Sequence, residues 1–156
     1  MNMQEIKKLL KEAQDKMLQA DHLAFTTYPQ VQEPKMLGLV VEDVNVIFLN
    51  CMNALLLYER MYKRIEPVKG DFNSELGVLR NHCFRKYGYP SQVANMIAEV
   101  RALVEKKRTC PLEFRRKDSY LLCSEDYKID SLNFKVVRNY VNEAKRFLNK
   151  TMDVLK

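Results

Sequence analysis

Glycine and proline are scarce in this sequence, whose 156 residues include only 4 glycines and 5 prolines. So few residues of these two types exclude a collagen-like or low-complexity chain. The scattered glycines also exclude the phosphate-binding loop of P-loop nucleotide hydrolases, which needs glycine where the backbone approaches a phosphate. With 47% hydrophobic residues, the chain is too apolar for intrinsic disorder. These features predict one globular domain over residues 1–156.

Histidines and cysteines are too few or too widely spaced for familiar catalytic and metal-binding motifs. The 2 histidines are His22 and His82, and no H-E-x-x-H or G-x-S-x-G motif occurs. No C-x-x-C pair occurs either, because the cysteines are Cys51, Cys83, Cys110 and Cys123. We therefore expect no zinc or other metal, no cofactor, no catalytic residue and no enzymatic activity.

Neither a signal peptide nor a membrane span is expected. Charged residues interrupt the first ten positions, so the apolar core of a signal peptide is missing there. The longest stretch without a charge, residues 44–58, is short for a membrane span and includes asparagines. Together with cysteines that form no disulfide framework, this favours a soluble protein of the reducing cytoplasm.

Apolar residues recur at spacings of three and four along most of the chain, which is the pattern of amphipathic helices. This spacing predicts helices over about residues 3–27, 34–64, 72–87, 90–107 and 131–155. The second helix is apolar on nearly all sides, which is typical of a helix surrounded by others. We predict an all-α fold, an antiparallel bundle of about five helices around this central second helix.

Residues 109–131 lose the helical period and predict a short insert before the last helix. Within it, residues 120–123 and 127–129 could form two short strands, joined through residues 124–126. We interpret them as a small β-hairpin, with an irregular loop as the alternative.

Three residue types predict where helices begin or end. The Tyr28-Pro29 pair is expected to stop the first helix, because the residue before a proline disfavours helical backbone. Gly88 is expected to cap the C-terminus of the third helix. Ser131 is expected to cap the N-terminus of the last helix.

A run of basic residues before the last helix is the strongest surface signal. Six cations lie between residues 106 and 117 with Glu113 as the one carboxylate, and we name them the basic cluster: Lys106, Lys107, Arg108, Arg115, Arg116 and Lys117. Such a cluster is ordinarily a solvated segment whose arginines pair with carboxylates elsewhere in the bundle. Because Phe114 lies inside it, an alternative is a surface that binds nucleic-acid phosphates and stacks a base. A surface for an acidic protein is the third possibility.

Polar residues inside the apolar second helix predict a buried polar network. Asp43, Asn50 and Asn53 lie partly on one face of that helix. Because an isolated buried charge is very costly, we expect these side chains to be hydrogen-bonded to one another or at the bundle end. A ligand or metal pocket is the alternative, although the repeated Glu-x-x-His pairs of di-iron bundles do not occur.

Both histidines are expected on solvated helix faces. Asp21 adjoins His22, but neighbouring residues of a helix point about 100° apart and do not automatically pair. His82 could also contact phosphate, because its neighbours in the sequence include the cations Arg80, Arg85 and Lys86.

Five short motifs are spread over most of the chain: Ala20-Asp21-His22-Leu23, Thr27-Tyr28-Pro29, residues 50–60 ending in Tyr58-Glu59-Arg60, Pro111-Leu112-Glu113-Phe114-Arg115-Arg116-Lys117 and Cys123-Ser124-Glu125-Asp126-Tyr127. In these motifs the sequence resembles an uncharacterised family of small helical archaeal proteins. The bundle of that family resembles in turn the HEPN group of helical domains, which includes RNA-cleaving toxins and non-catalytic relatives. The resemblance implies a binding or scaffolding bundle.

The sequence departs from the HEPN nucleases at their motif, an arginine separated from a histidine by four to six residues. The positions at that spacing before His82 are Glu75, Leu76 and Gly77, and those before His22 are Asp15, Lys16 and Met17. None of them is an arginine, so the resemblance does not extend to a ribonuclease role.

We therefore expect a non-enzymatic interaction or scaffolding bundle. Its partner would be another protein or a second copy of the chain, in a homodimer formed through exposed helix faces. The alternative is an RNA- or DNA-associated protein that binds phosphate through the basic cluster. The two differ in salt dependence, because binding through phosphate contacts weakens steeply as salt rises.

Overall fold

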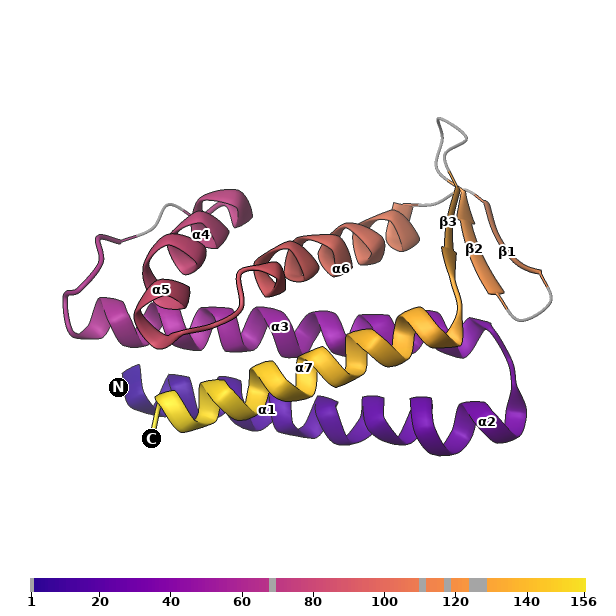
Figure 1. Cartoon of the computed structure of the whole chain (residues 1–156), viewed down its shortest axis with the longest axis horizontal. Coiled ribbons are helices and arrows are strands. Elements are labelled where there is room, and N and C mark those ends of the chain that lie inside the picture. The colour runs from indigo at the N-terminus through magenta and orange to yellow at the C-terminus, as the bar shows by residue number, and fades with distance from the viewer. Residues whose placement is uncertain (1, 68–69, 110–111, 117–118, 124–128) are drawn as a thin grey trace.

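The structure, a computed structural model, describes residues 2–67, 70–109, 112–116, 119–123 and 129–156, with residues 2, 112–116, 123, 129 and 130 described by backbone alone. These residues form five helical segments. The first joins α1 (Asn2–His22), the π-helix η1 (Leu23–Thr27) and α2 (Tyr28–Val31), and the second is α3 (Lys35–Met61). The third joins α4 (Phe72–Val78), the π-helix η2 (Leu79–Phe84) and α5 (Arg85–Tyr87); α6 (Gln92–Thr109) and α7 (Phe134–Val154) follow. The prediction of an all-α bundle of about five helices is confirmed (Figure 1).

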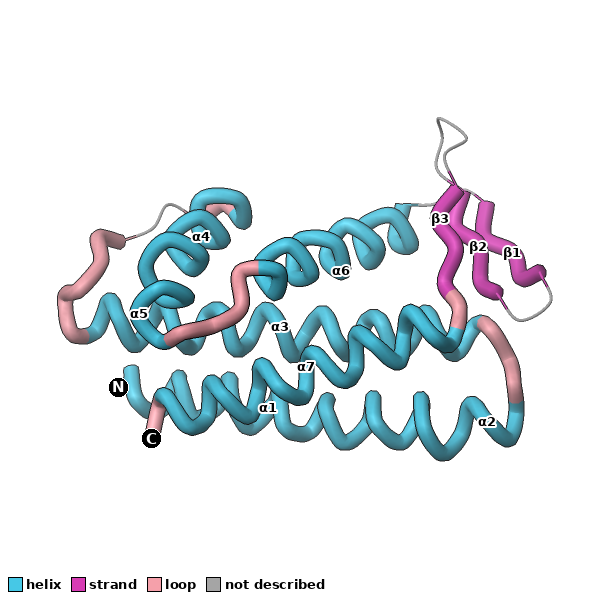
Figure 2. The backbone as a smooth tube through the Cα atoms, viewed as in Figure 1, coloured by secondary structure: helices cyan, strands magenta, loops and turns pink. Residues whose placement is uncertain are grey.

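Helix α3 runs through the centre of the bundle, as its nearly continuous apolar sequence predicts. Helices α1, α6 and α7 pack along it, and η2 contacts it as well (Figure 2). Leu37, Val44, Phe48 and Leu55 are all fully buried. Burying one such side chain stabilises the fold by about 1.5–3 kcal/mol, so packing holds this β-branched sequence in a helix despite its intrinsic preference.

Helix α3 has the length and composition of a membrane span, with a mean hydropathy of 1.6 over its most apolar window. In the structure, however, 67% of that window is buried inside the bundle. The core helix of a soluble protein has the same properties. The fold is therefore compatible with a soluble protein.

A small antiparallel sheet stands at one end of the bundle, before α7 (Figure 1). Its strands β1 (Leu112–Arg116), β2 (Ser119–Cys123) and β3 (Ile129–Leu132) lie in the order β1-β2-β3. In the β2–β3 pair, Tyr120 lies opposite Leu132 and Cys123 opposite Ile129, which confirms the predicted hairpin. The edge strand β1 was not predicted, because its charged sequence is typical of a loop.

The π-helical turn η1 explains why the first helix continues past a proline. A stop was predicted at Tyr28-Pro29, and this was wrong because α2 continues to Val31. The wider turn of a π-helix shifts the hydrogen-bond pattern, and Pro29 then falls at the first positions of α2, where its missing N–H costs nothing. Gln32, in the left-handed conformation with φ 53°, ends the helix instead.

The two other predicted caps have different outcomes. Gly88 ends α5 in the left-handed conformation with φ 74°, as predicted. Ser131 does not cap the last helix, because β3 extends through it. Asn133 does so, with its Oδ1 accepting from the Val136 N–H at 2.9 Å.

Gly38 lets the sheet approach the central helix closely. A Cβ atom at Gly38 would lie 2.8 Å from the Tyr120 ring of β2 and 2.9 Å from Cε of Lys107. Such distances are shorter than real Cβ contacts, so glycine is required at this crossing for the observed packing.

Candidate functional site

Glu59 is a carboxylate near the end of α3 whose side chain is fully buried. Its Oε1 accepts from Nε2 of His82 at 2.7 Å and from Nζ of Lys86 at 2.9 Å. Its Oε2 accepts from Nη1 of Arg64 at 2.7 Å and from the hydroxyl of Tyr87 at 2.9 Å. A carboxylate offers about four acceptor positions, so these contacts fill its capacity. We name these five residues the Glu59 site.

The turn after α3 brings Arg64 back to Glu59. Lys63 adopts the left-handed conformation with φ 58°. Its N–H donates to the Arg60 carbonyl, and the Arg64 N–H donates to the Glu59 carbonyl, both at 2.9 Å. This pair of bonds is a Schellman motif, which reverses the chain after a helix. The reversal explains how Arg64 contacts the Glu59 side chain.

The third helical segment supplies the other donors. His82 lies in η2, and Lys86 and Tyr87 lie in α5. His82 and Lys86 are four positions apart and therefore project from one face of the helix. Because π-helical turns occur frequently at functional sites, this cluster is a good candidate for one.

Hydrogen bonding keeps Glu59 ionised. Burial alone would raise the pKa of Glu59, but the hydrogen bonds from Lys86, His82, Arg64 and Tyr87 outweigh it and lower the pKa to about 2. In return, the hydrogen bond with Glu59 raises the pKa of both Lys86 and Arg64. An anion whose acceptor positions are filled is a poor proton acceptor at neutral pH, so its role is to hold its donors in place.

Cations and aromatic rings beside Glu59 form a surface open to solvent. Tyr62 is 53% exposed, and the guanidinium carbon of Arg64 lies 4.7 Å from the centre of its ring. The Tyr58 ring packs edge-on against Tyr62 at 5.1 Å. Lys63 and Arg85 are exposed and have no ion pair within the described part of the chain. We name the following residues the α3-end surface: Tyr62, Lys63, Arg64, Arg85 and Lys86.

The predicted buried network of Asp43, Asn50 and Asn53 is wrong. Asp43 is buried, with its Oδ1 3.8 Å from Nζ of Lys16 on α1. Asn50 donates instead to the Leu9 carbonyl at 3.1 Å, and Asn53 is exposed. Two helical turns separate Asp43 from Asn50, which is about 10 Å along the axis and too far for a hydrogen bond.

Asp43 is the least satisfied carboxylate of the described core. Burial raises its pKa to about 6, although the nearby charge of Lys16 opposes the shift. Its Oδ2 is buried and has no hydrogen-bond partner among the residues described. The charged form of Asp43 is therefore disfavoured in the folded protein.

The basic cluster lies at the opposite end of the bundle from the Glu59 site (Figure 1). Lys106, Lys107 and Arg108 end α6, Phe114, Arg115 and Arg116 belong to the edge strand β1, and Lys117 lies outside the described residues. Lys107 is 18% exposed and pairs with Glu42 at 3.3 Å, and Arg108 pairs with Glu105 at 3.1 Å. Part of the charge of the cluster is thus neutralised within the protein.

The two histidines have different surroundings. His22 is exposed as expected, and Asp21 pairs with Lys145 at 2.8 Å rather than with its neighbour. His82 was expected on a solvated face, and this was wrong because it binds the buried Glu59. The sequence does contain a signal for the site. Glu59 lies four positions after the buried Leu55, on the same face of α3, and a buried carboxylate needs a hydrogen-bonding partner. Its donors in α5 and η2 lie 23 to 28 positions further along the chain.

The described cysteines are core side chains. Cys51 and Cys83 are buried and free, and burial raises the pKa of each thiol to about 12. Cys110 and the side chain of Cys123 lie outside the part that the structure describes. Within that part, no group of three or more His, Cys, Asp or Glu could hold a metal ion.

Comparison with known proteins assigns no family: no protein-family model, curated protein or solved structure matches the chain. The resemblance to the archaeal family and to the HEPN group therefore stays a prediction.

Proposed function

We propose that this protein is a non-enzymatic interaction bundle of the cytoplasm that binds single-stranded nucleic acid through the α3-end surface. One observation carries the proposal: Tyr62 is exposed and covered by the Arg64 guanidinium, beside the unpaired cations Lys63 and Arg85. Aromatic rings and guanidinium planes stack bases, while lysines and arginines contact phosphates. The surface combines both kinds of group.

The buried carboxylate of Glu59 holds two cations of this surface, Arg64 and Lys86, in place. Arg64 has five N–H donors and Lys86 has three, whereas each donates one described hydrogen bond to Glu59. Both side chains are 37% exposed, which leaves donors available for phosphate. Holding two flexible side chains in place before binding reduces the entropy lost when a ligand binds.

A non-enzymatic role is favoured by the hydrogen bonding of His82 and Glu59, the only His–carboxylate pair among the described residues. Glu59 accepts from four donors, and two of them, Arg64 and Lys86, already compensate its charge, so it has less capacity to stabilise a protonated His82 than the acid of a catalytic pair has. No hydroxyl or thiol nucleophile is hydrogen-bonded to His82 among the described residues. These observations favour binding over catalysis.

Fluorescence anisotropy of labelled single-stranded RNA, single-stranded DNA and duplex DNA at several salt concentrations tests the proposal. The double variant K63E/R85E removes the two unpaired cations and leaves the Glu59 contacts intact. The control K35E/K135E makes the same charge change at two exposed lysines in the first turns of α3 and α7. A negative charge near the N-terminus of a helix is stabilised by the helix dipole, so the control should fold.

We expect the K63E/R85E variant to bind single strands at least about tenfold more weakly than the control, because two phosphate contacts are lost. A third variant, R115E/R116E/K117E, reports on the basic cluster. Equal affinity of K63E/R85E and wild type would refute the α3-end surface, and a loss confined to the third variant would assign binding to the basic cluster. If no nucleic acid binds even at low salt, the proposal of nucleic-acid binding is refuted and binding of a protein partner is favoured.

We also propose self-association as a second candidate, on the basis of exposed apolar side chains on α1, η1, α2 and α3. Leu18 is 73% exposed, Val31 59%, Leu39 44% and Phe25 37%. A contact between two copies of the chain would remove these apolar side chains from water, which favours a dimer. Light scattering coupled to gel filtration tests this: a dimer mass that Leu18→Lys reduces to a monomer supports it, and a monomeric wild type refutes it.

A further inference from the structure

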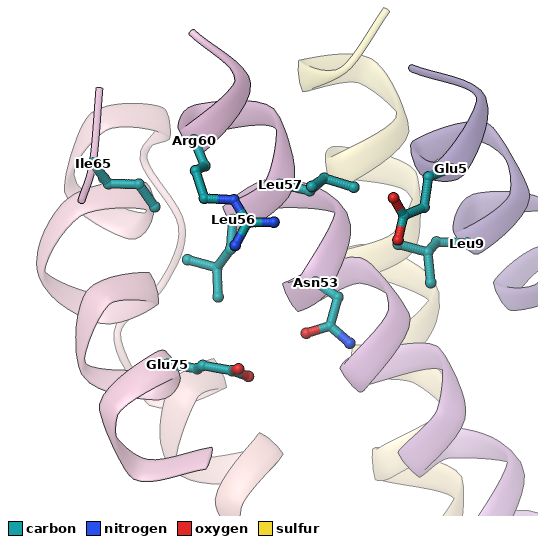
Figure 3. Close-up of a pocket in the computed structure, with 8 residues that line it drawn as sticks. All are labelled: Glu5, Leu9, Asn53, Leu56, Leu57, Arg60, Ile65 and Glu75. Carbon is teal, nitrogen blue, oxygen red and sulfur yellow. The ribbon is translucent and has the colours of Figure 1, made fainter. Parts of the chain in front are cut away.

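A second site lies on α3, around a pocket of about 220 Å³ between α1, α3 and α4 (Figure 3). Leu56 and Leu57 of α3 supply apolar surface. Arg60 and Asn53 of α3, Glu5 of α1 and Glu75 of α4 supply the polar groups. Arg60 follows Glu59, but successive helical residues point about 100° apart, so this pocket is separate from the Glu59 site. The inference does not rest on the proposed nucleic-acid binding.

The charged groups of this pocket are unpaired. Glu5, Arg60 and Glu75 form no ion pair or side-chain hydrogen bond with any described residue. In Figure 3 the Asn53 amide lies between the carboxylates of Glu5 and Glu75, and the guanidinium of Arg60 faces the same space. Two carboxylates and one guanidinium line one concave space without neutralising each other, and a ligand of complementary charge would satisfy all three.

We propose that this pocket binds a free basic α-amino acid of the lysine or ornithine class. The α-carboxylate of the ligand pairs with Arg60, because a guanidinium recognises a carboxylate with two parallel hydrogen bonds. The two ammonium groups of the ligand pair with Glu5 and Glu75. The methylene chain of the ligand lies over Leu56 and Leu57, and Asn53 offers both a donor and an acceptor.

Size and charge together select this class of ligand. The pocket is smaller than the roughly 300–1,000 Å³ of drug-sized sites and has room for about seven waters at about 30 Å³ each, which suits a metabolite of amino-acid size. A neutral amino acid would leave one carboxylate unpaired. A diamine would pair with both carboxylates but leave Arg60 without an anion.

Isothermal titration of the full chain with four probes tests the proposal: L-lysine, L-ornithine, L-norleucine and 1,5-diaminopentane. Norleucine lacks the side-chain ammonium, and the diamine lacks the carboxylate. Each omitted contact is a charge-assisted hydrogen bond, so we expect norleucine and the diamine to bind at least about tenfold more weakly than lysine.

Two variants separate the contacts. Arg60→Met should weaken lysine binding at least about tenfold without weakening diamine binding, because only the carboxylate partner is lost. Glu75→Gln should weaken the binding of both ligands, and the control Lys35→Met, at the other end of α3, should weaken neither. The three side chains line solvent-filled space or are exposed, and circular dichroism melts verify folding. Lysine that fails to bind at millimolar concentration, or that binds both pocket variants like wild type, overturns the proposal.

Discussion

Replacing Asp43 with asparagine should stabilise the fold at neutral pH. Burial raises the pKa of Asp43 from 3.8 to about 6, so the folded protein holds this proton more tightly than the unfolded chain does. Below pH 3.8 both states are protonated and Asp43 has no pH-dependent effect. As the pH rises to about 6, the unfolded chain releases the proton first, and the free energy of unfolding falls.

The size of the effect follows from the shift. About two pKa units correspond to about 3 kcal/mol at 1.36 kcal/mol per unit. Asparagine has a similar shape and no charge, so the Asp43→Asn variant escapes this cost. Lys16 then loses its partner, but its side chain is 35% exposed and stays hydrated. We expect a net gain of about 1–3 kcal/mol at pH 8 and about zero at pH 4.

Urea denaturation followed by circular dichroism between pH 4 and pH 8 measures this difference. The matched control is Asp15→Asn, which removes an exposed carboxylate paired with Lys11 on α1 and should change stability by less than about 0.5 kcal/mol. The reasoning is refuted if Asp43→Asn destabilises the protein at pH 8, or if its effect is the same at pH 4 and pH 8.

Two further predictions concern the Glu59 site and the glycines. Glu59→Gln should lower the free energy of unfolding at pH 7 by about 3–5 kcal/mol in urea, because the four donors lose their anion. The stability that Glu59 supplies is present above its ordinary pKa of 4.5 and is lost as the pH falls toward about 2, so a pH-independent difference between variant and wild type would contradict this. Gly38→Ala should lower the thermal midpoint, because its methyl group meets the buried Tyr120 ring. A Cβ atom at Gly77 would have no atom within 4 Å, so Gly77→Ala should stabilise α4 by about 0.5–1 kcal/mol. If both glycine substitutions raise the thermal midpoint, the close approach at Gly38 does not restrict that position to glycine.

The helices were predictable because each buries one face, and burial imposes a repeat that the sequence displays. The ends were less predictable, since they depend on hydrogen bonds that only the folded chain defines. The stop at Pro29 failed because a π-helical turn absorbs the proline. The strand β1 was missed because pairing with β2, rather than local composition, makes residues 112–116 extended.

The candidate site was harder to predict than the fold. Glu59 had a local signal, since it continues the buried stripe of α3, but Lys86 and His82 come from a helix much later in the sequence. The basic cluster was visible as a charge run. The partial neutralisation of this cluster was not visible, because the partner of Lys107 is Glu42, which is far away in sequence on the neighbouring helix α3.

The most direct test of the central claim is the salt dependence of single-stranded RNA binding by the wild-type protein and by K63E/R85E. If the four cations of the α3-end surface contact phosphate, the log-log slope for wild type is about −3, and the loss of two contacts makes it less steep by about 1.4. The account predicts this change together with weaker binding. An unchanged slope and affinity in K63E/R85E would contradict it.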